Sequence, residues 1–217
     1  MKLQILDRTD STIEVKLSGL ELDYGNALRR LAISEVPTMA IDDVVIIENS
    51  SIVYDELLSH RLGLIPLKTD LTRYIFPSDC DCDTKLGCSK CRVLLVLNAE
   101  PTDEIMTVYS RHLVSEDPSV IPVENNIPIL KLAPKQKVKL EAYAKLGRGK
   151  DHAKWQPTAA SVLKPVNNDG NEFTLTIEST GSLSASDIFL KAIEILNIKI
   201  KDLRDITKGL NIDAKES

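Results

Sequence analysis

The C-terminal part of the chain predicts one long amphipathic helix, and the width of its apolar face constrains the fold more than any other feature. Ser184 fits the position that caps a helix, and Asp187 stands three residues later, close to the pattern of a capping box. We expect the helix to run to about Lys208 and to stop at Gly209. At ~1.5 Å per residue, it would be roughly 37 Å long.

Apolar residues on this helix alternate spacings of four and three, as in a coiled-coil seam. The seam consists of Phe189, Ile193, Leu196, Ile200 and Leu203. Three more apolar residues widen the face beside it, namely Ile188, Ala192 and Ile195. The helix could be a core helix on the chain's own sheet, or its face could be shared with a partner chain. Because one sheet covers only one stripe of a helix, the width favours a shared face, which would be an association surface when uncovered.

The remainder of the chain reads as a mixture of strands and short helices. Alternating apolar residues at 2–7 and 12–17, separated by a turn-prone run, predict a hairpin. A helical period follows at 22–35, with an inward stripe of Tyr24, Ala27, Leu28 and Leu31, and ends before Pro37. A second short helix is expected at about 53–62, closed by Gly63.

Further strands are expected at 39–48, 92–98, 104–109, 137–145, 159–164 and 172–178. The stretch 113–135 holds four prolines and should be an extended loop. Residues 167–170, Asn-Asn-Asp-Gly, give a strong turn signal. The chain is therefore expected to combine strands with helices.

Composition excludes several classes of protein. The 217 residues are 43% hydrophobic and 27% charged, as in a globular chain rather than a disordered one. A net charge of −5 and only 4% aromatic residues argue against a general nucleic-acid binder. The N-terminus lacks the apolar core of a secretory signal, and no apolar stretch is long enough to cross a bilayer. We expect a cytoplasmic protein with no membrane partner.

All four cysteines stand in one short segment, Cys80-x-Cys82-x5-Cys88-x2-Cys91. A tight cluster in a cytosolic chain favours a metal site over a disulfide framework. Four thiolates suit tetrahedral Zn²⁺ and leave no open position, so the site would be structural rather than catalytic. The first spacing is tighter than usual for zinc, which leaves disulfides, free thiols and an iron–sulfur cluster as alternatives.

Two polar groupings could contact partners. On the helix at 22–35, Asn26 and Arg30 lie one turn apart beside Arg29, either as a solvated face or as an anchor into a partner's carboxylates or carbonyls. The one basic run with an aromatic residue comprises Arg148, Lys150, His152, Lys154 and Trp155. It could be a solvated loop, a phosphate or nucleic-acid contact, or a protein contact with Trp155 as its hot spot. Nothing places a nucleophile or a carboxylate beside any histidine, so no catalytic residue is predicted.

Four sequence blocks are similar to those of a known family. Gly25–Pro37 resembles the signature helix of the RNA polymerase alpha-subunit family, and Ser59–Pro66 resembles a second block of that family. Gly149–Trp155 and Ser115–Pro118 resemble blocks of its archaeal and eukaryotic branch. The blocks follow the family's order and span most of the chain.

This resemblance implies an α+β fold in two domains. A discontinuous dimerisation domain, with an antiparallel sheet and helices, would comprise residues 1–48 and 171–217. An inserted, mostly-β domain with the cysteine loop would comprise 49–170. The resemblance also implies a non-catalytic assembly subunit of a DNA-directed RNA polymerase, whose active site belongs to other subunits. It would pair with the smaller subunit L through the seam and form a platform for subunit N and the second-largest subunit, with no direct nucleic-acid contact.

The resemblance also bears on the metal and on the two polar groupings. Eukaryotic members carry a zinc loop in the region of the cysteines. Some archaeal members carry a ferredoxin-like insert, for which this chain offers only a short turn at 166–171 and no further cysteine, so we expect no iron–sulfur cluster. Both polar groupings become expected contacts with other polymerase subunits. The competing hypotheses are a zinc-loop nucleic-acid-binding protein, which needs a basic metal loop, and a metalloenzyme, which needs an open metal position.

Overall fold

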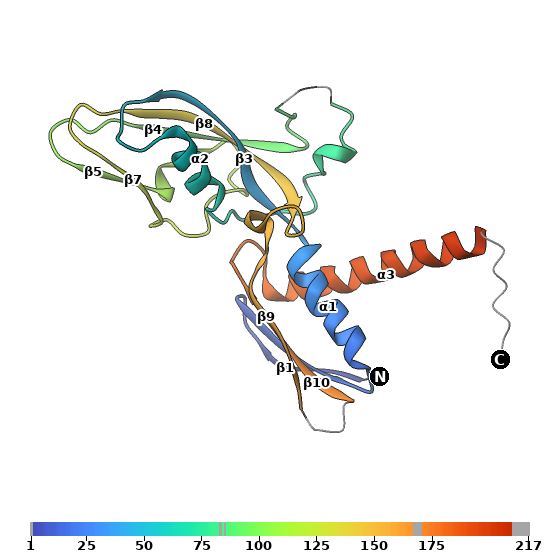
Figure 1. The fold of residues 1–217 in the computed structure, drawn as a ribbon. Helices are drawn as coiled ribbons and strands as arrows, with labels where there is room; N and C mark the ends of the chain where they lie inside the picture. The colour runs from blue at the N-terminus through green and yellow to red at the C-terminus, as the bar shows by residue number, and fades with distance from the viewer. Residues whose placement is uncertain (1, 83, 85, 167–170, 210–217) are drawn as a thin grey trace. The chain divides into compact units, whose positions relative to one another are not determined.

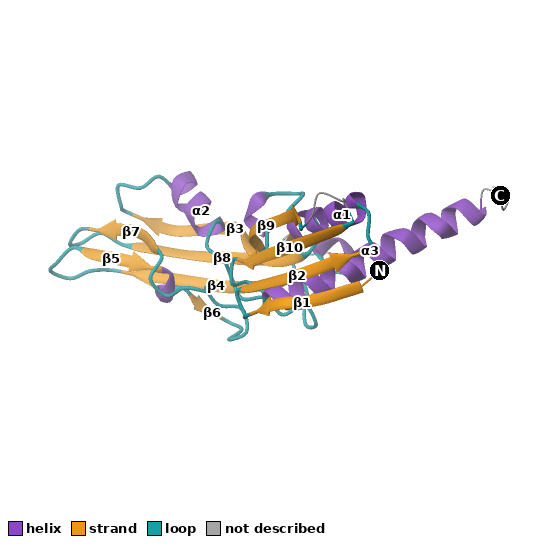
Figure 2. Ribbon diagram, turned by 90° about the horizontal axis from the view of Figure 1, so that it is seen from below, coloured by secondary structure: helices purple, strands orange, loops and turns teal. Residues whose placement is uncertain are grey.

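The computed structural model describes residues 2–82, 84, 86–166 and 171–209, and the chain divides into two compact units. The first unit draws on both ends of the chain: Met1–Val36, Thr158–Ser179 and Ser184 onward. The second unit comprises Pro37–Pro157 and Thr180–Leu183. Both units combine antiparallel sheets with helices, which confirms the predicted α+β class (Figures 1 and 2).

A four-stranded antiparallel sheet forms the centre of the first unit. Its order is β1-β2-β10-β9. The strands are β1 (Lys2–Arg8), β2 (Thr12–Ser18), β9 (Thr158–Pro165) and β10 (Glu172–Ser179). The two helices are α1 (Leu22–Ser34) and α3 (Ala185–Gly209), and they pack on one face of this sheet (Figure 1). The predicted hairpin at the N-terminus is confirmed as β1 and β2.

Strict alternation along the two central strands creates the core of this unit. The inward residues of β2 are Ile13, Val15 and Leu17, and those of β10 are Phe173, Leu175 and Ile177, all buried. Because successive side chains of a strand point to opposite faces, a period of two places all six on the face that the helices cover. The predicted turn at 167–170, between β9 and β10, lies outside the described residues.

The start of α3 follows the predicted capping. The Ser184 Oγ accepts a hydrogen bond of 3.1 Å from the backbone N–H of Asp187 and donates one of 2.6 Å to the Asp187 carboxylate. This satisfies an amide that the first turn leaves without an intrahelical partner. The acidic side chain also lies favourably at the positive end of the helix dipole.

The inward stripe predicted for α1 is wrong by one residue. The structure buries Gly25, Leu28 and Ala32, whereas Tyr24 is 54% exposed. Gly25 packs beneath Leu163 of β9, and a Cβ built on it would lie 3.0 Å from the Leu163 Cδ2. The helix therefore approaches the sheet at its glycine, which turns Tyr24 outward.

The second unit is built on a sheet of order β3-β8-β4-β6 and a two-stranded sheet of β5 and β7. These strands are β3 (Pro37–Asn49), β4 (Arg92–Ala99), β5 (Met106–Tyr109), β6 (Val114–Ser115), β7 (Pro128–Leu132) and β8 (Val138–Arg148). The helix α2 (Asp55–Gly63) packs against β3 and β7. Three short 3-10 turns complete the unit: Pro77–Asp79, Ser110–His112 and Ala153–Trp155.

The core of the second unit joins these elements. Leu58 and Leu62 of α2 are fully buried in a cluster with Leu95 of β4 and Leu140 of β8. The expectation of an extended loop over 113–135 is wrong in part, because β7 lies within it. Pro128 stands at the first position of β7, where a strand tolerates the missing N–H.

A buried carboxylate ties two loops of this unit together. Asp117 is 5% exposed and accepts hydrogen bonds from the Tyr74 hydroxyl and from the backbone N–H of Ser119, and it pairs with Arg73. The hydrogen bond from Tyr74, together with those from Ser119, lowers the pKa of Asp117. The carboxylate is therefore ionised in the folded chain, and it satisfies donors that would otherwise be buried without partners.

The two compact units differ from the predicted domains of 1–48 with 171–217 and 49–170. Residues 37–48 fall in the second unit because β3 pairs with β8, and residues 158–165 fall in the first because β9 pairs with β10. The described part of the chain contains no helix long and apolar enough to span a bilayer.

Candidate functional site

The seam predicted on α3 is covered at its start and bare at its end. Phe189 is 4% exposed and packs in the core of the first unit. Ile193 and Leu196 are half-buried. Ile200 and Leu203 are 45% and 62% exposed. The chain's own sheet and α1 therefore cover the first half of the seam, whereas the second half is largely exposed in the described chain.

An ion pair near the middle of α3 joins this helix to the residue that follows α1. Lys199 forms an ion pair of 3.1 Å with Glu35, which follows the end of α1. Beyond this point α3 extends past the sheet and α1, as Figure 1 shows within this unit. Ile206 is 61% exposed and continues the flank that the buried Ile188 begins, because 18 residues complete five helical turns.

The edge of the sheet adds to this bare apolar surface. Leu3 and Ile5 of β1 stand opposite Leu17 and Val15 of β2, so they point to the helix-bearing face. They are nevertheless 47% and 50% exposed, because α1 and α3 pack mainly against β2, β9 and β10. A face that is apolar on both a sheet edge and a helix, and bare on both, is typical of a protein interface.

The polar residues of α1 separate into one internal pair and one outward side chain. The Arg29 Nε donates a hydrogen bond of 2.9 Å to the Asn26 Oδ1. Arg30 is exposed, and its guanidinium makes no hydrogen bond or ion pair within the described part of the chain. Of the three residues predicted as partner contacts, Arg30 is thus the one presented to solvent.

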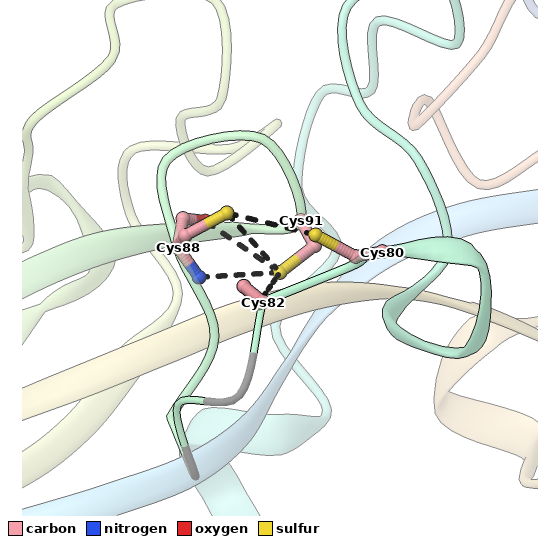
Figure 3. A group of neighbouring side chains, drawn as sticks. All are labelled: Cys80, Cys82, Cys88 and Cys91. Atoms are coloured by element: carbon pink, nitrogen blue, oxygen red, sulfur yellow. Dashed lines mark hydrogen bonds between the residues drawn. The ribbon is translucent and has the colours of Figure 1, made fainter.

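The four cysteines come together in the loop between Pro77–Asp79 and β4 (Figure 3). All four are free thiols, and Cys91 is buried. The Sγ atoms of Cys80 and Cys88 lie 3.6 Å apart, as do those of Cys82 and Cys91, and Cys88 and Cys91 are 3.9 Å apart. All four sulfur atoms lie within 4.8 Å of one another.

These distances fit a tetrahedral metal site. A zinc ion that holds four thiolates at about 2.3 Å requires sulfur atoms roughly 3.8 Å apart along the edges of the tetrahedron. The observed separations bracket this value, and they far exceed the roughly 2.05 Å of a disulfide bond. The residues therefore fit zinc, and four cysteine ligands leave no coordination position for a substrate or a catalytic water.

The loop is shaped around Cys91. The backbone N–H of Cys88 donates a hydrogen bond of 3.2 Å to the Cys91 Sγ. Gly87 has a positive φ of 83°, and a Cβ built on it would lie 2.9 Å from the same sulfur. Only glycine combines this backbone conformation with so close a sulfur atom. An N–H donor to a thiolate stabilises the charged form that a metal requires.

The thiols polarise one another. A hydrogen bond from Cys80, with further ones from Thr84 and Cys91, lowers the pKa of Cys82 to about 6. Burial raises the pKa of Cys91. Because a metal ligand must be deprotonated, zinc would displace the proton that Cys91 holds at neutral pH. The carboxylates of Asp79 and Asp81 flank the cluster, so these described residues do not form the basic surface that a nucleic-acid-binding metal loop needs.

The basic run ending at Trp155 is held mainly by contacts within its own unit. The Arg148 guanidinium stacks over the Phe76 ring at 4.5 Å. Lys154 forms an ion pair with Asp42 and lies 4.3 Å from the centre of the Trp155 ring. Lys150 and His152 are exposed.

Trp155 has an internal role that the sequence did not reveal. Its Nε1 donates a hydrogen bond of 3.1 Å to the Lys145 carbonyl, and its own carbonyl accepts one of 2.8 Å from Thr38. Its ring lies against Gly147, where a Cβ would come within 2.3 Å of the indole. The indole is half-buried in this position, so the ring fixes the loop to β8 and β3.

A charge network lies beside this loop and was not predicted. Lys145 pairs with both Asp42 and Asp43, and Lys154 pairs with Asp42. Although burial opposes it, the hydrogen bond and charge of Lys154 and the charge of Lys145 lower the pKa of Asp42. The two negative charges of the carboxylates thus balance the two positive charges of the ammonium groups within the network. The alternating pattern of β3 did not indicate this network, because the lysines that pair with Asp42 come from β8 and from a turn, both more than a hundred residues away in the sequence.

Comparisons with known proteins agree on one family. A family model described as the RNA polymerase Rpb3/RpoA insert domain matches residues 41–162, which take in most of the second unit. A DNA-directed RNA polymerase subunit Rpo3 from Methanosphaera stadtmanae is 44% identical over 166 residues, 76% of this chain and 61% of the relative. Subunits of the same name from Pyrobaculum islandicum and Pyrococcus furiosus are 50% and 45% identical, over 74% and 72% of this chain and 60% and 56% of the relatives. The matches thus span about three fifths of the length of these relatives.

Proposed function

Because this chain belongs to the RNA polymerase Rpb3/RpoA family, we propose that it is a non-catalytic assembly subunit of an archaeal DNA-directed RNA polymerase, the counterpart of the Rpo3 subunits it matches. The observation that carries the proposal is the second half of α3, where Ile200 and Leu203 are 45% and 62% exposed in the described chain. An apolar helix face of this kind needs a second polypeptide to remove it from water. In this proposal the active site lies on other subunits, and the assembly works in the cytoplasm.

The partner on α3 is proposed to be the smaller subunit L. The seam residues Ile193, Leu196, Ile200 and Leu203 supply the helix contact, while Phe189 anchors the helix to its own sheet. The exposed side chains of β1 extend the same apolar face at the sheet edge. The first compact unit would thus act as the dimerisation domain, with its two chain ends joined in one sheet.

The second unit is proposed to form the platform for subunit N and the second-largest subunit, and the outward face of α1 is proposed as a separate contact with other polymerase subunits. Arg30 presents a guanidinium with no partner among the described residues, which suits a carboxylate or a carbonyl of another chain. The hydrogen bond between Asn26 and Arg29 would stabilise the side-chain arrangement on α1 next to Arg30. Lys150 and His152 are the exposed members of the basic run.

Zinc is the proposed occupant of the cysteine loop. Cys80, Cys82, Cys88 and Cys91 would hold it, and the ion would supply charge neutralisation and cross-linking for a segment with little regular structure. Gly87 and the N–H of Cys88 shape the loop around Cys91. The role is structural, and the proposal includes no iron–sulfur cluster.

Co-expression with subunit L tests the proposal. The two chains should copurify and elute from a size-exclusion column as a 1:1 pair, as measured by light scattering. Adding the second-largest subunit and subunit N should then give a larger complex. A well-behaved monomer that ignores subunit L would contradict the proposed pairing, and a pair that recruits neither further subunit would contradict the proposed platform.

A further inference from the structure

Two pockets flank one exposed leucine at the C-terminal end of α2. The first has a volume of about 230 Å³ and lies between β3, α2 and the turn at Ala153–Trp155. The second has a volume of about 260 Å³ and lies between the end of α2 and β7. Leu64, which is 52% exposed, lines both pockets. Each volume suits one large side chain rather than a small-molecule ligand.

The first pocket is lined by polar side chains that are free to donate a hydrogen bond. Its only carboxylate, on Asp42, is already engaged by the two lysines of the charge network. The Ser59 hydroxyl and the His60 ring make no hydrogen bond within the described part of the chain. Both can turn a hydrogen toward the pocket.

The tautomer of His152 adds a third donor. Its Nδ1 accepts a hydrogen bond of 3.0 Å from the backbone N–H of Lys154, at the start of the 3-10 turn. A neutral imidazole that accepts at Nδ1 carries its hydrogen at Nε2. Within the described chain that Nε2 has no partner, so His152, which lines the pocket, has an N–H available for a ligand.

The second pocket is apolar. Apart from Arg61, its walls come from Leu64, Ile65 and the segment Ile127–Ile129. The Arg61 side chain donates a hydrogen bond of 2.8 Å to the Pro128 carbonyl, which fixes it as one wall. An aliphatic side chain is the occupant that such walls favour.

We propose that this pair of pockets binds one short segment of another polymerase subunit in which an acidic side chain stands close to an aliphatic one. The carboxylate would accept hydrogen bonds in the first pocket from His60, His152 and Ser59, and the aliphatic side chain would enter the second. The inference rests on the proposed function and names the chemistry of the partner at one surface of the platform. A carboxylate fits because Ser59, His60 and His152 can each donate a hydrogen bond to it and the neighbouring pocket is apolar, a combination that a nucleic-acid phosphate does not match.

The test compares two substitutions that introduce the same charge. His152→Asp keeps an acceptor for the Lys154 N–H but replaces the donor in the pocket with a carboxylate. Tyr54→Asp is the matched control, because Tyr54 is 81% exposed at the N-cap of α2 and lines neither pocket. Each variant is paired with subunit L, and its affinity for the second-largest subunit is measured by biolayer interferometry.

We expect His152→Asp to weaken this docking by about tenfold or more, and Tyr54→Asp to leave it unchanged. A second probe is an array of 15-residue peptides that cover the second-largest subunit and subunit N. The bound peptides should contain an acidic residue near an aliphatic one. Replacing that acidic residue with its amide should abolish peptide binding by the wild-type pair. The weak peptide binding of the His152→Asp pair should not change with the same replacement.

The outcomes separate the inference from the function on which it rests. If the wild-type pair docks and the His152→Asp pair docks equally well, the inference about the two pockets is overturned, while the proposed platform function is retained. If the wild-type pair does not dock at all, the platform and the inference both fall. Displacement of the bound peptide by a short DNA duplex at physiological salt would also overturn the inference, because it would identify the pocket as a phosphate site.

Discussion

A single charge placed on the bare half of α3 should separate pairing from folding. Leu203 is 62% exposed in this chain and lies on the seam that we assign to subunit L. Replacing it with Asp removes an apolar side chain from the proposed interface and puts a carboxylate in its place. The fold of the free chain has little reason to change, because exposed substitutions usually alter stability by less than about 0.5 kcal/mol.

The magnitude follows from the exposure. Full burial of a leucine is worth ~1.5–3 kcal/mol, so burying its exposed 62% against a partner is worth about 1–2 kcal/mol. An unpaired carboxylate in the interface costs at least about 3 kcal/mol more. The sum exceeds about 4 kcal/mol, which weakens the dissociation constant roughly a thousandfold.

Leu190 provides a matched control on the same helix. It is also 62% exposed, and the 13 residues that separate it from Leu203 put the two side chains on different faces, roughly 140° apart. Isothermal titration of each variant with subunit L should show binding lost for Leu203→Asp and kept for Leu190→Asp, with equal melting temperatures for the two free chains. Wild-type affinity for Leu203→Asp, or equal losses for both variants, would refute the assignment of the seam.

Three further predictions concern the second unit. Gly147→Ala should expel the indole of Trp155, because the added Cβ would occupy the position of the ring. Since Trp155 is the chain's only tryptophan, its fluorescence should shift to longer wavelength, and the melting temperature should fall. An unchanged fluorescence spectrum would contradict the contact between Gly147 and the indole. Zinc binding at pH 7 should release protons from Cys80 and Cys91, because the pKa values of both thiols are raised. Calorimetry in buffers of different ionisation enthalpy should detect about two or more protons released per zinc ion. Removal of zinc by a chelator without uptake of protons would argue against thiolate ligands. Asp117→Ala should cost about 3 kcal/mol at pH 7 by leaving buried donors unpaired. Because folding lowers the pKa of Asp117 from 3.8, the contribution of its charge is present above pH 3.8 and is lost as the pH falls further, so the difference in unfolding free energy between wild type and variant, measured in urea, should narrow only below about pH 3.8.

The sequence predicted most of the regular structure because the apolar periods were strong. Alternation defined β2 and β10, and the Ser184 cap defined the start of α3. The inward stripe of α1 was missed by one residue, because only the packing of Leu163 against Gly25 decides how the helix is rotated. Propensity alone treats a glycine as a weak point of a helix rather than as its contact with the sheet.

The cysteine cluster was predictable because its members are close in sequence, whereas the pockets beside α2 were not. Asp42, His60 and His152 meet only after β3, α2 and a distant turn have packed together. The basic neighbours of Trp155 left three roles open, and the family resemblance led to its prediction as a partner contact. Its hydrogen bond to the Lys145 carbonyl depends on the path of β8, which no local pattern encodes.

The most direct test of the central claim is hydrogen exchange of the free chain and of its complex with subunit L. We predict that backbone amides in the second half of α3, from about Ile198 to Lys208, exchange quickly in the free chain and at least about tenfold more slowly in the complex. Amides of β3 and β8 serve as the internal reference and should not change. Equal exchange of α3 with and without subunit L would contradict the claim that a second polypeptide covers this face.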